Sequence, residues 1–159
     1  MDMTGEQLIP MPQAETWAAL NDVEVLKDVI PGCEGLEKVS DEEFHVQVQT
    51  KIGPVSARFK GRMTLKDIDP PSGYTIVFDG QGGAAGFAKG EARVDLVPDG
   101  EQTLLRYTAK ATIGGKLAQI GSRLVDGAAR KLADQFFTAF RARYTEAGAG
   151  SESGEPKGE

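Results

Sequence analysis

Residues 44–66 read FHVQVQTKIGPVSARFKGRMTLK, with apolar and polar side chains alternating on both sides of a Gly53-Pro54 pair. Alternation with a period of two gives a β-strand one apolar face and one wettable face. A glycine next to a proline is typical of a turn. The segment therefore predicts two long antiparallel strands joined by a tight connection, as in a strongly curved sheet.

The same alternation extends over much of the remaining chain. Residues 69–73 (DPPSG) and 98–100 (PDG) separate the repeats and are typical of turns. Beyond the first hairpin, strands are predicted over residues 3–9, 74–78, 88–97 and 104–113. We therefore expect an antiparallel sheet of about seven strands.

Two short helices are predicted after the first strand. One covers residues 14–20 (AETWAAL), and the other covers residues 23–30 (VEVLKDVI), which Asn21 or Asp22 can cap. Pro31-Gly32 ends the second helix, because proline disfavours the helical conformation of the residue before it and glycine accepts a left-handed one.

After Gly114-Gly115 the apolar residues adopt helical spacing. A helix with one apolar face buries it against the concave face of the sheet. We therefore predict an α+β fold in which a curved antiparallel sheet wraps around a long C-terminal helix of about eight turns. The residues of the apolar face are Leu117, Ile120, Leu124, Ala128, Leu132, Phe136 and Phe140.

The chain of 159 residues is long enough for one domain, which we assign to residues 1–144. Residues 145–159 (TEAGAGSESGEPKGE) contain four acidic residues, one lysine and nothing apolar larger than alanine. Such a composition cannot compensate the entropy of ordering, so we predict a disordered acidic tail.

Composition excludes several classes of function. There are 24 acidic and 18 basic residues, a net charge of −6 that argues against nucleic acid as the main partner. A single cysteine excludes an internal disulfide, and a single histidine leaves too few ligands for a zinc site, so no metal is expected. The N-terminus lacks the features of a signal peptide, no apolar run could span a bilayer, and we expect a cytoplasmic protein.

A sheet that curves around one helix leaves a gap between them, and a pocket there is the default functional hypothesis. Most inward side chains could be ordinary core, but small inward residues such as Gly61 and Gly80 favour a cavity. Gly121 and Gly127 of the expected helix favour it too, since each costs about 1 kcal/mol relative to alanine. The predicted ligand-binding residues are Phe44, Phe59, Met63, Ile76, Phe78, Phe87, Tyr107, Ala109, Leu117, Ile120, Gly121 and Leu124.

Two patterns suggest chemistry at first sight. Residues 80–85 match the dinucleotide-binding pattern G-x-G-x-x-A, but the pattern requires a following helix and a strand is predicted there, so a hairpin connection is favoured. Cys33 could be a nucleophile if His45 reached it, yet no third group orients them, and we expect a buried unreactive thiol and a solvated histidine. No catalytic residue is assigned, and a non-enzymatic role is expected.

Residues 116–144 carry six basic and two acidic side chains, on an otherwise acidic protein. This basic helix could dock on an anionic membrane leaflet or an acidic partner. An ordinary solvated helix face explains the charge equally well.

Several segments, in this order and spacing, resemble the CoxG family of carbon monoxide dehydrogenase subunits. The resemblance covers residues 1–144, and its PGCE and GGKLAQ segments are the most specific. The segments are WAAL at 17–20, VL at 25–26, IPGCE at 30–34, IGPV at 52–55, GFAKG at 86–90 and GGKLAQIG at 114–121.

The resemblance implies a START-like helix-grip fold of the SRPBCC superfamily and a non-catalytic accessory protein of an aerobic molybdenum carbon monoxide dehydrogenase or a related hydroxylase. Family members are implicated in recruiting the dehydrogenase to the inner face of the cell membrane and in holding a quinone, such as menaquinone or ubiquinone, as electron acceptor. In this chain Tyr107 is the candidate donor to the quinone head group.

Some relatives end in a hydrophobic or membrane-associating segment, whereas this chain ends in a short acidic one. Stable membrane anchoring is therefore not implied here, and reversible peripheral contact is the expectation. Two hypotheses remain: a carrier of a lipophilic quinone, and a ligand-free assembly or membrane-recruitment factor acting through the basic helix. A small enzyme that uses the cavity is a third alternative.

Overall fold

The computed structural model describes residues 1–151, with side chains described to residue 144. The alternating segment forms two neighbouring strands of one sheet. Strands β3 (Glu43–Ile52) and β4 (Val55–Asp69) pair antiparallel. Val46 lies opposite Gly61 and Val48 opposite Phe59, so the apolar faces of both strands coincide. Gly53 has a φ of +59° in the connection, a conformation that glycine adopts without strain.

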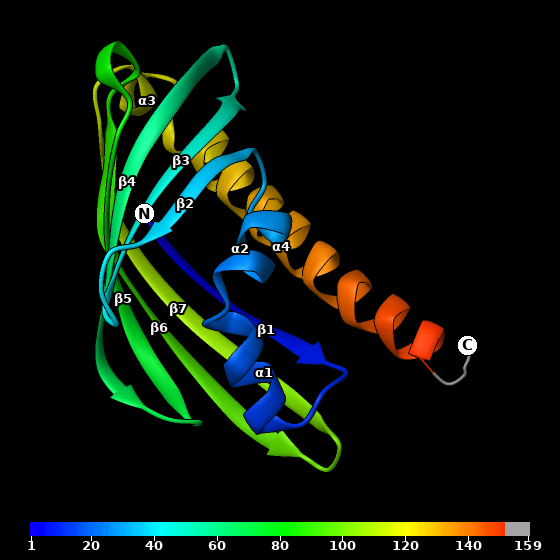
Figure 1. Cartoon of the computed structure of the whole chain (residues 1–159). Coiled ribbons are helices and arrows are strands. Elements are labelled where there is room, and N and C mark those ends of the chain that lie inside the picture. The colour runs from blue at the N-terminus through cyan, green and yellow to red at the C-terminus, as the bar shows by residue number, and fades with distance from the viewer. Residues whose placement is uncertain (152–159) are drawn as a thin grey trace.

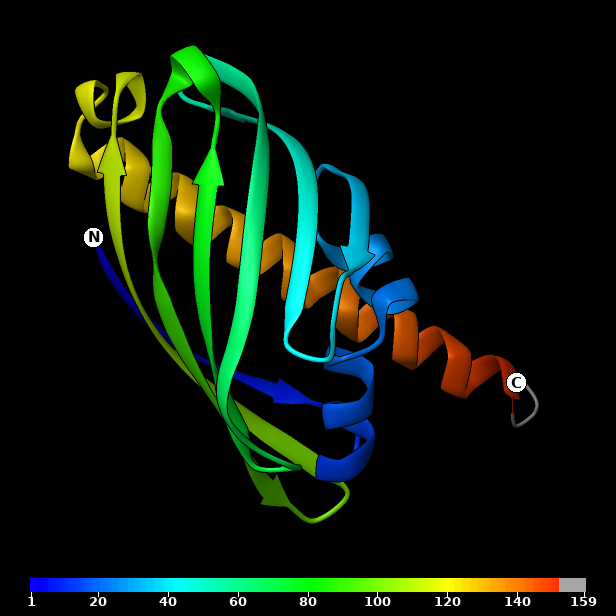
Figure 2. The ribbon, with the colours of Figure 1, turned by 60° about the vertical axis from the view of Figure 1, so that its left-hand side comes forward.

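All strands of the described chain belong to one antiparallel sheet of seven strands (Figure 1), which confirms the predicted architecture. The order across the sheet is β1-β7-β6-β5-β4-β3-β2. Its curvature creates a concave face toward the helices, as Figure 2 shows from a second direction. The remaining strands are β1 (Asp2–Ile9), β2 (Cys33–Lys38), β5 (Gly73–Gln81), β6 (Phe87–Asp99) and β7 (Gln102–Gly114).

Strand β2 was missed by the sequence analysis. It is a short edge strand in which only Leu36 is buried, and its pairing with β3 shifts register between Cys33 and Gly35. The shift interrupts the alternation on which a sequence-based prediction depends.

The two short helices form as predicted. Helix α1 (Gln13–Leu20) follows Pro12, and helix α2 (Val23–Val29) is capped by Asp22, whose Oδ1 accepts a hydrogen bond from the Glu24 amide at 3.0 Å. The hairpin between β5 and β6 carries a single 3-10 turn, η1 (Gly83–Ala85). Strand β6 follows that turn, so the glycine-rich segment is a hairpin connection, as favoured, and not a nucleotide-binding loop.

The predicted single C-terminal helix is wrong in one respect, because it is two helices, α3 (Lys116–Gln119) and α4 (Ser122–Ser151). Gly121, which was placed inside the helix, has a φ of +98° and joins them. The break changes the phase of the helix. Val125, Phe137 and Phe140 are buried, whereas Leu124, predicted to face inward, is 52% exposed.

Helix α4 also extends beyond the predicted end of the domain. Residues 145–151 are helical, although they were assigned to the disordered tail. Extending an existing helix by a few residues requires little free energy, because the unfavourable nucleation step has already taken place in the packed part of the helix. The rest of the predicted tail, residues 152–159, lies outside the described residues.

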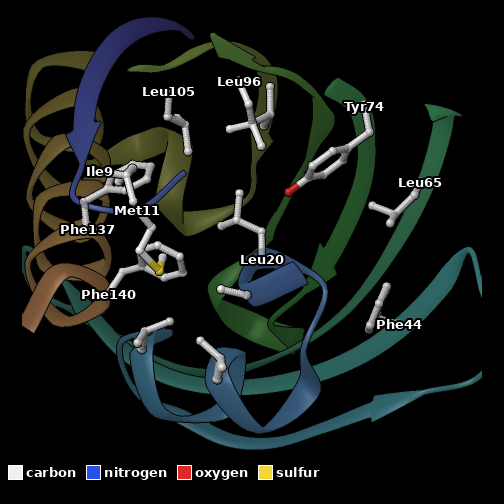
Figure 3. Close-up of a cluster of buried hydrophobic side chains, with 14 of the residues drawn as sticks. Ile9, Met11, Leu20, Phe44, Leu65, Tyr74, Leu96, Leu105, Phe137 and Phe140 are labelled. Atoms are coloured by element: carbon white, nitrogen blue, oxygen red, sulfur yellow. The ribbon is translucent and has the colours of Figure 1, made fainter. Parts of the chain in front are cut away.

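Helix α4 runs obliquely across the concave side of the sheet; α2 packs beside it, and α1 lies next to α2 (Figures 1 and 2). The most deeply buried side chains, Ile9, Leu105 and Phe140, join β1, β7 and α4 in one cluster (Figure 3). Thr16 of α1 and Thr103 of β7 are buried there as well, and their hydroxyls lie 3.2 Å apart. The same cluster continues across the sheet to Leu65 and Phe44, which lie beside the apolar space over β3, β4 and β5.

Candidate functional site

An apolar cavity of about 280 Å³, here called the inner chamber, lies between the short helices and strands β3 to β5. The helices supply one wall and the inward residues of the strands supply the other, because side chains alternate between the two faces of a strand. Asn21 and Tyr74 supply the polar side chains. The lining residues are Leu20, Asn21, Leu26, Ile30, Phe44, Val46, Val48, Met63, Leu65, Tyr74, Ile76 and Phe136.

A second cavity of about 330 Å³, the outer chamber, lies farther along the same strands toward α3. Val46, Val48 and Met63 line both chambers, so the two adjoin. Gly61 pairs with Gly80, and Gly80 pairs with Ala88, which places three small residues side by side on the floor of the outer chamber. The lining residues are Val46, Val48, Thr50, Ile52, Phe59, Gly61, Arg62, Met63, Phe78, Asp79, Gly80, Ala88 and Leu117.

Half of the predicted ligand-binding residues line these chambers. The structure brings together six of them from β3, β4, β5 and α3, which are Phe44, Phe59, Met63, Ile76, Phe78 and Leu117.

The other predicted residues are not among those that line the two chambers: Phe87, Tyr107, Ala109, Ile120, Gly121 and Leu124. The ring of Phe87 packs on Gly114 so closely that a Cβ added to Gly114 would lie 2.2 Å from the ring. Ile120 and Leu124 instead approach Gly53 at the tip of the β3-β4 hairpin. Inward direction alone therefore does not place a side chain in the cavity.

Sequence reasoning missed the contribution of the short helices, which supply Leu20, Asn21, Leu26 and Ile30. No pattern in one sequence tells which side of a two-turn helix faces a sheet that is distant along the chain. The inward face of β3 was recognised, and Val46 and Val48 could have been included on that signal. Tyr74 could have been found in the same way, since it alternates in phase with Ile76 and Phe78.

Tyr74 is the most deeply buried of the three tyrosines, with 5% of its surface exposed. Burial raises the pKa of its hydroxyl well above the ordinary value of 10.0, because a phenolate would lose its hydration. The ring packs edge-on against Trp17, with centroids 5.3 Å apart and planes at 89°. The hydroxyl is therefore neutral and able to donate a hydrogen bond into the inner chamber.

Tyr107, the donor expected from the sequence, lies in a different place. Its ring stacks on Phe137 with centroids 5.7 Å apart and lies over Gly5 of the edge strand β1. Partial burial raises the pKa of its hydroxyl, and Asp134 raises it further, while Arg130 opposes the shift. These neighbours place the Tyr107 hydroxyl among charged groups of α4 and not in either chamber.

The structure separates Cys33 from His45. Cys33 pairs with Val48, and three positions along β3 separate Val48 from His45, so His45 faces the opposite side of the sheet. His45 lies on the outer face, as predicted, where its Nε2 is 2.7 Å from a Glu43 oxygen. Cys33 was expected to be fully buried, but it is only half-buried. Its Sγ lies 3.5 Å from the Gly35 carbonyl oxygen.

The basic residues near the C-terminus fall into two groups. Arg141 donates to Gln7 and Arg143 pairs with Asp28, so both tie α4 to the body of the protein. Within residues 1–144, no ion pair involves the four others, Lys116, Arg123, Arg130 and Lys131, and all four are exposed.

None of the helices in the described residues is both long enough and apolar enough to cross a membrane. Over the same part of the chain, no group of three or more His, Cys, Asp or Glu side chains is arranged to hold a metal ion.

A family model described as CoxG, one of the subunits of carbon monoxide dehydrogenase, matches residues 5–144. Among solved structures, a conserved protein from Geobacillus kaustophilus is 31% identical, with a TM-score of 0.86 over 92% of this chain and 97% of that one. No curated protein matches the chain.

Two more distant structures share the fold. A START superfamily protein from Mycobacterium smegmatis is 16% identical, with a TM-score of 0.70 over 91% of this chain and 97% of that one. The Zhui aromatase/cyclase from Streptomyces sp. R1128 is 14% identical, with a TM-score of 0.69 over 98% and 99%. At such identities the likeness concerns the fold, which is the START-like helix grip expected from the sequence.

Proposed function

The chain belongs to the CoxG family of carbon monoxide dehydrogenase subunits, and from this premise we propose that it is a non-catalytic accessory protein that carries a prenylated respiratory quinone. The partner is a molybdenum hydroxylase such as carbon monoxide dehydrogenase. A quinone bound in the cavity would accept electrons from this partner and pass them to the membrane respiratory chain during reversible peripheral contact. The protein itself holds the ligand and excludes water from it.

The observation that carries this proposal is the pair of adjoining apolar chambers. Their volumes of about 280 and 330 Å³ lie close to the lower limit of about 300 Å³ for small-molecule sites. Strand β3 lines them from Phe44 to Ile52, a length of about 26 Å at about 3.3 Å per residue. A long apolar space of this kind suits a ring with an extended prenyl tail.

The driving force for binding is burial of hydrocarbon. Each Å² of apolar surface removed from water contributes about 25 cal/mol. Most of the chamber walls consist of Val, Ile, Leu, Met and Phe side chains, which meet a prenyl tail without leaving polar groups unpaired. The composition of the walls thus favours a lipophilic ligand over a charged metabolite.

The proposal is tested by native mass spectrometry of the protein purified from its own host, followed by organic extraction. We expect about one prenylated quinone per chain. Added 2-decyl-1,4-naphthoquinone should also quench the fluorescence of Trp17, the single tryptophan, whose ring lies against Tyr74 of the inner chamber. A protein that is purified without quinone and whose fluorescence does not respond to the added compound would contradict the proposal.

A second candidate function rests on the four exposed basic residues of α3 and α4. As a ligand-free assembly or recruitment factor, the protein would dock through them on an acidic partner or an anionic membrane surface. The double variant Arg123→Glu/Arg130→Glu should then lose binding to the hydroxylase in a pull-down. The control variant Lys51→Glu/Lys60→Glu makes the same change of charge on the outer face of the sheet and should still bind. Equal binding of both variants would rule out this surface as the docking site for the hydroxylase.

A further inference from the structure

Tyr74 places a hydroxyl inside a chamber whose walls are otherwise almost entirely hydrocarbon. It lies near the beginning of β5, in phase with the inward residues Ile76 and Phe78. Figure 3 shows the side chain pointing from the strand into the interior, with its oxygen on the side of Leu20. Only 5% of the residue is exposed, so bulk water does not solvate the hydroxyl.

This hydroxyl has no hydrogen-bond partner among the residues that the structure describes, and other buried hydroxyls of the protein behave differently. Thr16 Oγ1 donates to the Pro12 carbonyl at 3.0 Å, and Thr103 Oγ1 donates to the Met11 carbonyl at 2.7 Å. Thr75 Oγ1 accepts from Arg93 at 3.5 Å. Buried polar groups in proteins are nearly always paired, so an unpaired one that faces a cavity indicates a partner that occupies the cavity.

The partner must offer an acceptor. The raised pKa of the Tyr74 hydroxyl keeps it protonated throughout the physiological range, so it presents an O–H donor. Asn21, the other polar residue of the inner chamber, donates one of its two Nδ2 hydrogens to the Trp17 carbonyl at 2.9 Å, and the residue is half-exposed, so water is within reach of the second. In the outer chamber, the hydroxyl of Thr50 is half-exposed and within reach of water. Tyr74 is therefore the buried donor that remains available.

We propose that the Tyr74 hydroxyl donates a hydrogen bond to a carbonyl oxygen of the bound ligand, which fixes the ligand's direction in the cavity. The ring lies in the inner chamber beside α1 and α2, and the tail runs along β3 into the outer chamber. This inference rests on the proposed function, because it assigns the head group of the quinone to one end of the same site.

The test compares two ligands that differ only in their carbonyl groups, 2-decyl-1,4-naphthoquinone and 2-decylnaphthalene. Their dissociation constants are measured by isothermal titration calorimetry on the wild type, on Tyr74→Phe and on Tyr107→Phe. The last variant removes the same atom from a tyrosine outside the chambers. We expect Tyr74→Phe to weaken binding of the quinone about tenfold and to leave binding of the naphthalene unchanged, and Tyr107→Phe to change neither.

The outcomes separate this inference from the proposed function. If Tyr74→Phe binds the quinone as tightly as the wild type does, or loses both ligands equally, the hydrogen bond is refuted while quinone binding itself stands. If the wild type binds neither compound, the proposed function fails, and the assignment of Tyr74 fails with it.

A second measurement needs no variant and decides the question if Tyr74→Phe does not fold. The carbonyl stretching band of the quinone, labelled with ¹³C at the carbonyl carbons, is recorded by infrared spectroscopy in the wild-type protein and in an alkane. A carbonyl that accepts a hydrogen bond should absorb at lower wavenumber in the protein. Equal band positions in the two media would overturn the assignment.

Discussion

At the level of single residues, the size of the cavity depends on where glycine replaces a larger side chain. Gly61 and Gly80 lie side by side on the floor of the outer chamber. An added Cβ at Gly61 would lie 3.0 Å from Val46 Cγ1, which is tight, whereas one at Gly80 would meet only the Ala88 carbonyl oxygen at 3.5 Å. Space is thus left open above Gly80, in line with a ligand that fills it.

Leucine at position 80 should fill the outer chamber without unfolding the protein. We expect Gly80→Leu to weaken binding of 2-decyl-1,4-naphthoquinone at least tenfold, because the added side chain competes with the ligand tail for the same space. Gly35→Leu is the matched control, since a Cβ there meets nothing within 4 Å. Calorimetric titration checks both variants, and unchanged affinity in Gly80→Leu would show that the outer chamber holds no ligand.

Tyr74 also predicts a pH dependence of stability. In the folded state, burial raises the pKa of its hydroxyl above the ordinary value of 10.0, which applies to the unfolded chain. Above pH 10 the unfolded chain therefore binds fewer protons than the folded one. The contribution of Tyr74 to the free energy of unfolding is therefore fully present below about pH 10. It falls as the pH rises above that value, by up to about 1.4 kcal/mol per pH unit for one tyrosine. Urea unfolding at pH 9 and pH 11 should show a smaller loss in Tyr74→Phe than in the wild type. Equal losses would mean that the phenol is not desolvated.

At the level of elements, the joint between α3 and α4 decides which face of α4 is buried. Gly121 interrupts the helical path with a φ of +98°, and Val125 is the first buried residue after it. Ile120 and Leu124 consequently lie against the tip of the β3-β4 hairpin and not in the chambers. The joint thus positions α3, whose Leu117 closes the outer chamber, independently of α4.

Alanine substitutions at the two glycines of this region should have opposite effects. At Gly121 the positive φ makes alanine strained, so we expect the free energy of unfolding to fall by about 1–3 kcal/mol. At Gly127, inside α4 and with nothing within 4 Å of an added Cβ, alanine should raise it by about 1 kcal/mol. Chemical denaturation measures both values, and equal signs would contradict the break in the helix.

At the level of the whole molecule, packing is divided between two sides of the fold. Ile9, Leu105 and Phe140, the most deeply buried apolar members of the core cluster, lie on the side of β1 and β7, while the chambers occupy the side of β3, β4 and β5. On the second side, the apolar side chains that line the chambers leave space between them. A ligand there should act as part of the core.

Ligand binding should therefore stabilise the protein according to mass action. At a free concentration one hundred times the dissociation constant, we expect 2-decyl-1,4-naphthoquinone to add about 2.7 kcal/mol to the free energy of unfolding. Thermal denaturation should show a midpoint that rises with ligand concentration in the wild type, and a much smaller rise in Gly80→Leu. The same rise in both proteins would indicate binding outside the chambers.

The sequence by itself determined the elements whose signal is local. The alternation in residues 44–66 predicted β3, β4 and their turn, and Asp22 was one of two predicted caps of α2, because the pattern and the structure it predicts lie within a few residues. Six of the twelve predicted ligand-binding residues line the chambers for the same reason, since the inward face of a strand follows from its phase.

Only the tertiary structure decided which inward residues touch and which leave space. Phe87 and Tyr107 face inward yet pack on Gly114 and Phe137, while Tyr74 opens into the inner chamber. The edge strand β2 and the break at Gly121 depend on a register shift and on one backbone angle, which the spacing of apolar residues does not record. A cavity is a property of distances between segments remote in sequence, and those distances are fixed only when sheet, short helices and α4 pack together.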